Sequence, residues 1–516
     1  MNDIPYEENE RTIISEVNEE LGDSGWDLKE FILGFLFYRF LSEKITYQVN
    51  QNQENAKAPY KNYTVLEDEI ALRGKKSIIE EFGYHIPPSE LFEKIVENAT
   101  NDPNLNETLS CIFSNIEASA VGSQSESSFK GLFRELDLNS ERLGSTVKKR
   151  NETLAKYLRM VASWQLTIHN SEHSFGNIFE SLIGNFASKV GKKGGNFFTP
   201  RTVSELLVNL ALTNHSDVKN IYDPACGSGS LLLKFTTVLG KTTKTIEYFG
   251  QDEDLTFYNF CRINMLLHNV SFDEADIEHG DTLVNPKHIN LDKFDVVVSN
   301  PRFSKAWEGD SNPLLINDPR FSSAGVLAPK GKHDMAFIMH SLYALNEKGV
   351  AVLAEHPGVM YRSKNEQKIR KYLIESNYID CVIQLPPNLF FGVTIAPNIL
   401  ILKKARETTD VLFINADKHF VRNGNKNILN SENIRHIMDI YVNRADIDFT
   451  SRVVGQDEIR AKDYLLTVTG YIHSEDIREK VDIQTVNSSI KEIVRKQNEL
   501  RTYIDTLVND LEGTPL

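Results

Sequence analysis

Two short motifs, each directly after an apolar run typical of a strand, constrain this chain more than any other feature. The first is Asp-Pro-Ala-Cys-Gly-Ser-Gly-Ser at 223–230, and the second is Asn-Pro-Arg-Phe at 300–303. Gly227 and Gly229 let the backbone pass close to a ligand, as in the Gly-rich turns of doubly wound α/β folds. Asn-Pro-x-aromatic offers two oxygen acceptors beside a flat ring. Together the motifs predict a nucleotide-like cofactor beside a planar amine, and hence methyl transfer to an amino group.

Acidic residues between the two motifs strengthen this prediction, because a Gly-x-Gly or an Asn-Pro alone often only turns the chain. Asp252 follows a strand-like stretch, Thr245 to Phe249, at a suitable place for a carboxylate that binds ribose hydroxyls. Asp281 closes a third strand–loop unit and is the candidate for the adenine edge of the cofactor. Either aspartate taken singly is equally compatible with a helix cap.

The hydrophobic pattern predicts an α/β fold with helical regions on either side. Residues 1–165 are expected to form an N-terminal helical domain, and 166–475 a catalytic domain with a mainly parallel sheet flanked by helices. The segment 304–332, rich in Gly, Pro, Ser and Asp, is expected to be a loop or lid, since it follows the Asn-Pro-Arg-Phe motif. The expected strands are Asn220–Tyr222, Thr245–Phe249, Phe294–Ser299, Val350–Ala354, Ile379–Gln384 and Ile399–Lys403.

The C-terminal residues 476–516 carry an apolar stripe with alternating spacings of three and four. This pattern predicts a helix that contacts a partner in the manner of a coiled coil, although packing on the protein's own body fits nearly as well. The stripe consists of Val486, Ile490, Ile493, Leu500, Ile504, Leu507 and Leu511, with Gln497 at the one missing step.

In the order of its motifs the chain resembles the modification (methyltransferase) subunits of type I restriction–modification systems, which are N6-adenine DNA methyltransferases. The resemblance extends over roughly residues 25 to 470. It rests on Gly194 to Arg201, Asp223 to Ser230, Gly250 to Asp252, Gly280 to Leu283, Asn300 to Phe303, Asp334 to His340, Leu385 to Phe390 and a helix at Phe31 to Lys44.

The resemblance implies a Rossmann-like, S-adenosylmethionine-dependent methyltransferase fold and a set of site residues. The catalytic candidates are Asn300, Pro301 and Phe303: two oxygens to accept the amino hydrogens of adenine and a ring to stack on a base swung out of the duplex. The candidates for S-adenosylmethionine binding are Asn196, Phe197, Phe198, Thr199, Pro200, Arg201, Asp223, Ala225, Gly227, Ser228, Gly229, Ser230, Asp252 and Asp281.

Arg302 departs from the family pattern, which has a second proline at this position. Proline fixes φ, so Arg302 is expected to loosen the loop and to add a charge beside the target base. If the glycine-containing loop 227–230 is separate from the loop that carries Asn300 and Phe303, Arg302→Pro raises turnover and leaves the affinity for S-adenosylmethionine nearly unchanged. A catalytically silent subunit that still binds S-adenosylmethionine and supports assembly therefore stays open. So does an amino methyltransferase that acts on RNA or on a protein glutamine.

Composition adds expectations about partners. A formal net charge of −15 suits a protein that does not grip DNA alone, because phosphate contacts dominate such binding. The resemblance implies a specificity subunit that reads the sequence, with two copies of this chain for each, and a restriction (motor and nuclease) subunit. The four cysteines lack C-x-x-C spacing, so no metal is expected. The acidic N-terminus and the lack of a long apolar run predict a cytoplasmic protein without a membrane contact.

Overall fold

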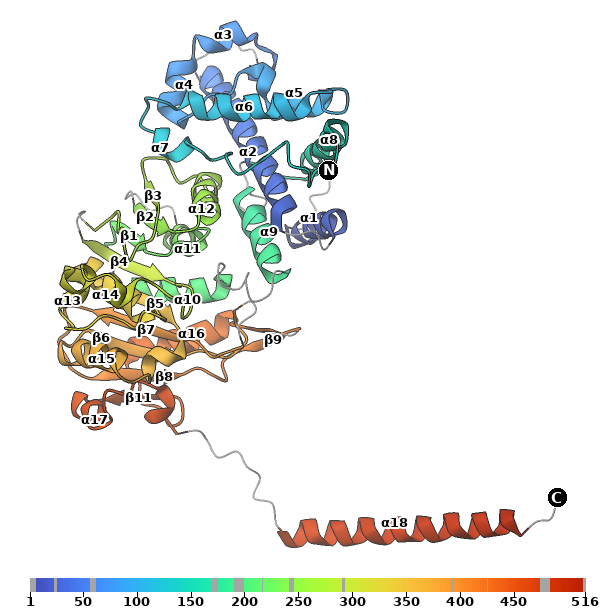
Figure 1. The fold of residues 1–516 in the computed structure, drawn as a ribbon, viewed down its shortest axis with the longest axis vertical. Helices are drawn as coiled ribbons and strands as arrows, with labels where there is room; N and C mark the ends of the chain where they lie inside the picture. The colour runs from blue at the N-terminus through green and yellow to red at the C-terminus, as the bar shows by residue number, and fades with distance from the viewer. Residues whose placement is uncertain are drawn as a thin grey trace. The chain divides into compact units, whose positions relative to one another are not determined.

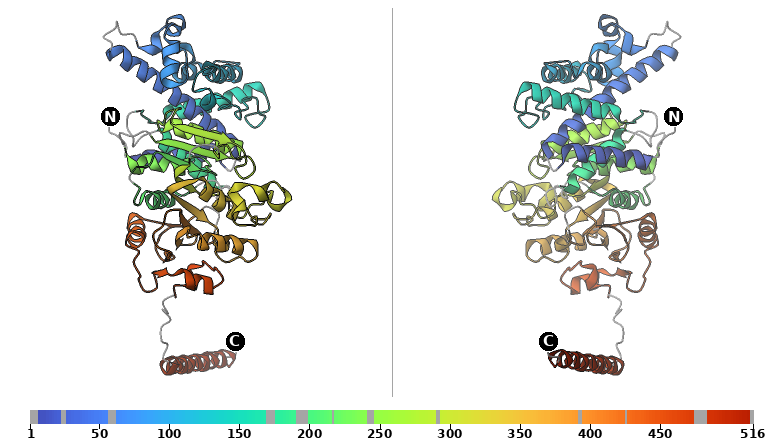
Figure 2. Two further views of the ribbon diagram at one scale, coloured as in Figure 1. Left: turned by 90° about the vertical axis from the view of Figure 1, so that its left-hand side faces the viewer. Right: turned by 90° about the vertical axis from the view of Figure 1, so that its right-hand side faces the viewer.

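The computed structural model describes residues 6–22, 26–55, 62–168, 175–189, 199–215, 217–240, 246–289, 293–390, 394–424, 426–473 and 483–513. It separates into two compact units, residues 1–472 and 473–516. Figure 1 shows the order of the helices and strands along the chain, and Figure 2 gives two further views.

The N-terminal part of the first unit is built around one long buried helix, α2 (Trp26–Asn55). Its side chains from Phe31 to Leu41 are almost all inaccessible to solvent, because neighbouring helices surround the helix. The predicted helical character of this region is therefore observed. The other helices are α1 (Tyr6–Leu21), α3 (Asp68–Leu72), α4 (Lys75–Phe82), α5 (Phe92–Asn98), α6 (Leu105–Ser119), α7 (Glu126–Phe129), α8 (Val147–Ser163) and α9 (Phe175–Lys189).

The rest of the unit is built on a nine-stranded sheet, whose strands lie in the order β11-β8-β6-β7-β5-β4-β1-β2-β3. The pairs β3–β2, β2–β1, β1–β4, β4–β5 and β6–β8 are parallel, whereas β5–β7, β7–β6 and β8–β11 are antiparallel. The predicted α/β class with a mainly parallel sheet is confirmed. The strands are β1 (Asn220–Asp223), β2 (Glu247–Asp252), β3 (Ala275–His279), β4 (Phe294–Ser299), β5 (Leu345–Glu355), β6 (Ile379–Gln384), β7 (Asn398–Lys403), β8 (Val411–Asn415) and β11 (Ser451–Val454).

Helices cover both faces of this sheet, which is why consecutive residues of its central strands are apolar and buried. In β4, Val296 and Val298 belong to the core on one face, while Val297 belongs to the core on the other. The first face packs against α10 (Arg201–Leu212), α11 (Ser230–Leu239), α12 (Leu255–Leu267) and α16 (Ser431–Asn443). The second packs against α13 (Pro319–Ser322), α14 (Asp334–Ala344), α15 (Asn365–Glu375) and α17 (Gln456–Ala461). A separate hairpin pairs β9 (Val421–Asn423) with β10 (Lys426–Ile428).

The segment 304–332 contains two short 3-10 helices, Gly309–Ser311 and Leu315–Asn317, followed by α13. Trp307 and Phe321 are buried and lie edge to face, with their ring centroids 5.6 Å apart. Arg320 is also buried and donates to the carbonyl oxygens of Thr282 and Leu283. The segment therefore packs on the sheet beside the loop after β3. Its role as a lid stays a prediction.

The second unit contains one helix, α18 (Ile483–Glu512), whose described side chains are exposed. The apolar stripe predicted from the sequence lies on this helix, with exposed fractions between 41% at Val486 and 77% at Leu511. Among the described residues, no helix is both long and apolar enough to cross a membrane.

Candidate active site

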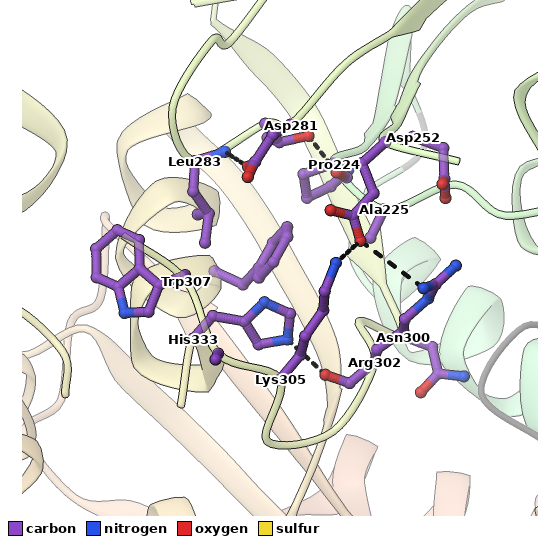
Figure 3. Close-up of a pocket in the computed structure, with 14 residues that line it drawn as sticks. Pro224, Ala225, Asp252, Asp281, Leu283, Asn300, Arg302, Lys305, Trp307 and His333 are labelled. Atoms are coloured by element: carbon purple, nitrogen blue, oxygen red, sulfur yellow. Dashed lines mark hydrogen bonds and ion pairs between the residues drawn. The ribbon is translucent and has the colours of Figure 1, made fainter. Parts of the chain in front are cut away.

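The carboxyl ends of β1, β2, β3 and β4 meet at one edge of the sheet, which is where ligands bind in open α/β folds. A cavity lies at this edge (Figure 3). The lining residues are Pro224, Ala225, Asp252, Glu253, Asp281, Thr282, Leu283, Asn300, Arg302, Lys305, Ala306, Trp307, His333 and Phe337.

The loop after β1 has the tight geometry that its glycines predict. Gly227 and Gly229 have φ angles of 55° and 76°, in the left-handed region that favours glycine. A Cβ on Gly229 would lie 2.7 Å from the Sγ atom of Cys261, so a larger residue would push the loop away from α12. Ser228 is buried, and its Oγ atom has no hydrogen-bond partner among the described residues. The loop leads directly into α11, whose first residue is Ser230.

Asp223 lies beneath this loop and does not line the cavity. Its Oδ1 atom accepts hydrogen bonds from the backbone N–H of Ala225, at 2.9 Å, and from the Ser299 hydroxyl, at 2.8 Å. These bonds join the ends of β1 and β4. Burial raises the pKa of Asp223 to about 7, against the lowering effect of the two hydrogen bonds. Asp223 therefore supports the loop, and its direct contact with the cofactor stays a prediction.

The pKa of Asp223 predicts a pH dependence of stability. Its folded-state pKa of about 7 lies above the ordinary value of 3.8, so the native state holds a proton that the unfolded state has lost. The stabilisation is complete below 3.8 and is lost as the pH rises to about 7. Asp223→Asn is expected to flatten this fall in the free energy of unfolding, measured by urea denaturation across the same window. The exposed Asp439→Asn is the control, and an unchanged slope in Asp223→Asn would contradict the assignment.

Asp252 lines the cavity at the end of β2, and both of its oxygens are oriented by backbone groups. Oδ2 accepts from the N–H of Gly227 and Oδ1 from the N–H of Asp254, each at 2.9 Å. Burial raises the pKa of Asp252, while these two bonds and the guanidinium of Arg302 lower it. A carboxylate oxygen has two lone pairs, so each oxygen retains capacity to accept a further hydrogen bond from a ligand.

Asp281 lines the cavity beyond Asp252, on the loop after β3. Its Oδ1 atom accepts from the N–H of Leu283 at 2.9 Å. The buried side chain of Gln251 holds this loop, because its amide group donates to the carbonyls of Gly280 and Asn285 and its Oε1 accepts from the N–H of Lys287. Both predicted carboxylates therefore border the same cavity, and Gln251 is a supporting residue to which sequence reasoning gave no role.

Asn300 lies at the end of β4, and its amide has a defined orientation. The Nδ2 atom donates to the Oγ1 atom of Thr199 at 3.0 Å, although the two residues are 101 positions apart in the sequence. With its nitrogen engaged, the amide presents Oδ1 as an acceptor. Thr199 was expected at the cofactor, and the structure places its hydroxyl against the catalytic candidate.

Phe303 is flanked by two aromatic rings from other loops. The ring centroids of Phe390 and His356 lie 6.0 and 6.1 Å away, in edge-to-face arrangements. Phe390 ends the segment Leu385 to Phe390, which follows β6, and His356 follows β5. Neither ring was assigned a role from the sequence. Their separation from Asn300 along the sequence could not indicate this contact. The order of the strands in the sheet brings the loops after β4, β5 and β6 together.

The remaining cofactor candidates are more dispersed. Thr199, Arg201 and Ser230 line a second cavity, between α9, α10 and α11. The guanidinium of Arg201 donates to the carbonyl of Asn177 and the hydroxyl of Ser181, so it is directed at α9. Pro200 caps α10. Asn196, Phe197 and Phe198 lie outside the described residues.

Arg302 connects the loop after β4 to the segment after β2. Its guanidinium contacts Asp254 at 3.4 Å and Glu253 at 3.8 Å, directly after the cofactor candidate Asp252. The expected effect of Arg302→Pro on turnover and on cofactor affinity stays a prediction. The side chain is long enough to span the cavity rim, which a proline could not do.

Comparison with known proteins assigns both parts of the chain. Residues 170–480 match the family described as N-6 DNA Methylase, and residues 24–161 match the HsdM N-terminal domain. The methylase subunit of the type I restriction enzyme MpnII from Mycoplasma pneumoniae is 41% identical over 505 residues, which are 95% of this chain and 93% of that protein. The MjaVII methylase subunit from Methanocaldococcus jannaschii is 32% identical, over 66% of this chain and 59% of that protein.

Solved structures show the same architecture. The methyltransferase subunit of a type I restriction–modification system from Streptococcus thermophilus superposes with a TM-score of 0.81 at 33% identity, over 90% of this chain and 99% of that one. A chain from a study of complex assembly in a type I restriction–modification system superposes with a TM-score of 0.61, over 95% of this chain and 94% of that chain. Since its identity is 17%, the second comparison supports the fold alone.

Proposed function

This chain belongs to the N-6 DNA Methylase family, as a modification subunit of the type I restriction–modification kind, and from that premise we propose that it transfers the methyl group of S-adenosylmethionine to the N6 amino group of adenine in DNA. The observation that carries the proposal is the Asn300 amide, which donates to Thr199 and so presents its oxygen as an acceptor, three residues before Phe303 in the same loop.

The cavity residues suit the proposed cofactor. A carboxylate at the end of β2 is suited to ribose hydroxyls, and Asp252 occupies that position with both oxygens oriented. Asp281 borders the same cavity and is our candidate for the adenine edge. Ser228 has a buried hydroxyl with no hydrogen-bond partner in the part of the chain that the structure describes, and it is our candidate for a further polar contact with the cofactor. When bound, S-adenosylmethionine supplies a methyl group already activated by its sulfonium centre.

The residues of this chain would act on the adenine amino group by position and by hydrogen bonding. The lone pair of that nitrogen is delocalised into the ring, which makes it a poor nucleophile. Asn300 Oδ1 and the carbonyl oxygen of Pro301 would each accept one amino hydrogen, so the nitrogen becomes more tetrahedral and its lone pair points out of the ring plane. Such fixed acceptors act mainly through geometry and electrostatics.

The target adenine would be held outside the duplex by aromatic contacts. Base-modifying enzymes extrude their target, because its reactive atom is not accessible inside the helix. Phe303 would stack on the base, and the rings of Phe390 and His356 would border the same space, since both lie edge-on to Phe303. The assay described below tests whether the chain methylates adenine in DNA in preference to RNA bases or a protein glutamine.

DNA binding would depend on partners. With a net charge of −15 the chain lacks the excess of cations that dominates phosphate binding. We propose that a specificity subunit provides sequence reading and most of the phosphate contacts, with two copies of this chain for each, and that a restriction subunit completes the assembly. The exposed apolar stripe on α18 is our candidate for the contact with the specificity subunit.

Transfer of tritiated methyl groups from S-adenosylmethionine tests the proposal. The purified chain would be assayed with and without a co-expressed specificity subunit, on duplex DNA, on RNA and on protein. We expect incorporation into adenine of DNA only with the specificity subunit. Cofactor binding without transfer by the complete assembly would favour a silent assembly subunit, and label in RNA or protein would favour the other amino methyltransferases.

Asp252 is expected to contribute strongly to cofactor affinity. Asp252→Ala should weaken S-adenosylmethionine binding by about 1–3 kcal/mol, the usual loss for hydrogen bonds to a charged group. Isothermal calorimetry of the isolated chain measures this, with Asp439→Ala on the exposed face of α16 as the control. Unchanged binding heat in Asp252→Ala would show that the cofactor lies elsewhere.

A further inference from the structure

The loop after β4, residues 300–305, is called the catalytic loop below. Its two cationic side chains, Arg302 and Lys305, form ion pairs with carboxylates that follow β2. The Arg302 guanidinium contacts Asp254 Oδ2 at 3.4 Å and Glu253 Oε1 at 3.8 Å. Lys305 also forms an ion pair with Glu253. Figure 3 labels Arg302 and Lys305 among the cavity residues, with dashed lines for their ion pairs, both of which involve Glu253. The Arg302 side chain is only 25% exposed, so the contact is partly shielded from solvent.

The carboxylate partners of Arg302 are fixed in turn by the cofactor side of the cavity. Asp254 caps the N-terminus of α12, where its Oδ1 atom accepts from the N–H groups of Thr256 and Phe257. The N–H of Asp254 donates to Asp252, whose other oxygen accepts from Gly227. A continuous series of contacts therefore runs from the glycine loop through Asp252 and Asp254 to Arg302.

The backbone of the catalytic loop is held from the opposite side. The carbonyl oxygen of Arg302 accepts from Nε2 of His333 at 2.5 Å, and the N–H of Ser304 donates to Asp334 at 2.7 Å. Asp334 also receives the guanidinium of Arg362. These bonds fix where the Arg302 backbone lies, and the ion pairs fix the direction of its side chain.

We propose that Arg302 is a positioning residue that fastens the catalytic loop to the segment Asp252–Asp254, so that cofactor binding and the placement of Asn300 depend on each other. This inference rests on the proposed function. A proline at this position would restrict φ but could make no contact across the cavity. Arg302 thus replaces a local restraint with a tie between the two halves of the site. The charge lies at the cavity proposed for the cofactor and is paired with Glu253 and Asp254.

A double-mutant cycle in the assembled enzyme tests the tie. Arg302→Gln removes the cation, and Asp254→Asn removes its partner's charge while keeping a good helix cap, since Asn and Asp cap equally well. Each single variant is expected to lower kcat and to weaken S-adenosylmethionine binding by about three- to tenfold, a typical coupling for ion-paired neighbours. The double variant should be no worse than the more affected single variant. Arg302→Lys should retain part of the effect, because it keeps the charge.

Arg460→Gln provides the control, because it breaks an ion pair with Glu375 that joins α17 to α15 and involves no residue of the cavity. It should leave kcat and cofactor affinity unchanged. Thermal unfolding of every variant distinguishes a folding defect from a positioning defect. A purely structural loss would lower stability without lowering both kcat and the affinity for S-adenosylmethionine.

Additive effects in the cycle, or an Arg302→Pro variant that equals or exceeds the wild type in turnover, would overturn the inference. Failure of the proposed function gives a different result: the wild-type assembly would transfer no methyl group to DNA. In that case the same cycle, measured on the free energy of unfolding, still tests the pairing of Arg302 with Asp254. Additivity there would also refute the tie.

Discussion

Asn300→Ala is expected to lower kcat for DNA methylation by about 10²–10³, as removal of one fixed polar group from a catalytic site commonly does. The substitution removes the Oδ1 acceptor that we propose for the amino group, while Asp252, Asp281 and the glycine loop remain. The affinity for S-adenosylmethionine should therefore stay close to that of the wild type. Steady-state methylation by the assembled enzyme and calorimetry with the cofactor measure the two quantities.

Thr199→Val sharpens this test, because it removes only the acceptor of the Asn300 Nδ2 hydrogen bond. The amide can then rotate and present its nitrogen, so we expect an intermediate loss of turnover. Asn443→Ala, on the exposed end of α16, controls for the loss of an asparagine side chain. Asn300→Ala with more than a tenth of wild-type turnover would mean that the Pro301 carbonyl alone suffices or that the base lies elsewhere.

The sequence allowed the central strands and the two carboxylates to be predicted because their signals are local. β1 and β4 are buried on both faces, so their apolar residues, Ile221–Tyr222 and Val296–Val298, are consecutive and end at polar loops. β3 was recognised only as a strand–loop unit, because most of its residues, Ala275 to His279, are partly or fully exposed. β8 and β11 were not predicted, although β8 is as apolar as the strands that were.

The contacts that shape the site were not predictable for a different reason. The Thr199–Asn300 bond joins residues 101 positions apart, and the Arg302–Asp254 contact joins residues 48 apart. Such pairs depend on strand order, which hydrophobic periodicity does not specify. Arg302 illustrates the consequence. Its departure from the family pattern was visible in the sequence as a missing proline, but its partners were visible only in the folded chain.

Removal of α18 is expected to have the other large effect. A chain truncated before Val486 should keep its fold and its affinity for S-adenosylmethionine, since the cavity lies entirely within residues 1–472. Binding to the specificity subunit should fall by about 10²-fold or more, because each large apolar side chain buried in an interface can contribute about 1.5–3 kcal/mol before the costs of association. Size-exclusion chromatography of the co-expressed subunits and DNA binding at physiological salt measure this loss.

Point substitutions distinguish the apolar stripe from the mere presence of a helix. Ile493→Asp and Leu500→Asp place charges on the stripe, where the side chains are 64% and 63% exposed, so they should disrupt a partner contact without unfolding the first unit. Lys491→Gln, outside the stripe, is the matched control and should assemble normally. If the truncated chain still assembles and methylates DNA like the full chain, the contact with the specificity subunit lies on the first unit. The stripe on α18 would then pack on another partner or on the protein's own body, because an isolated amphipathic helix gains nothing from exposing its apolar face to water.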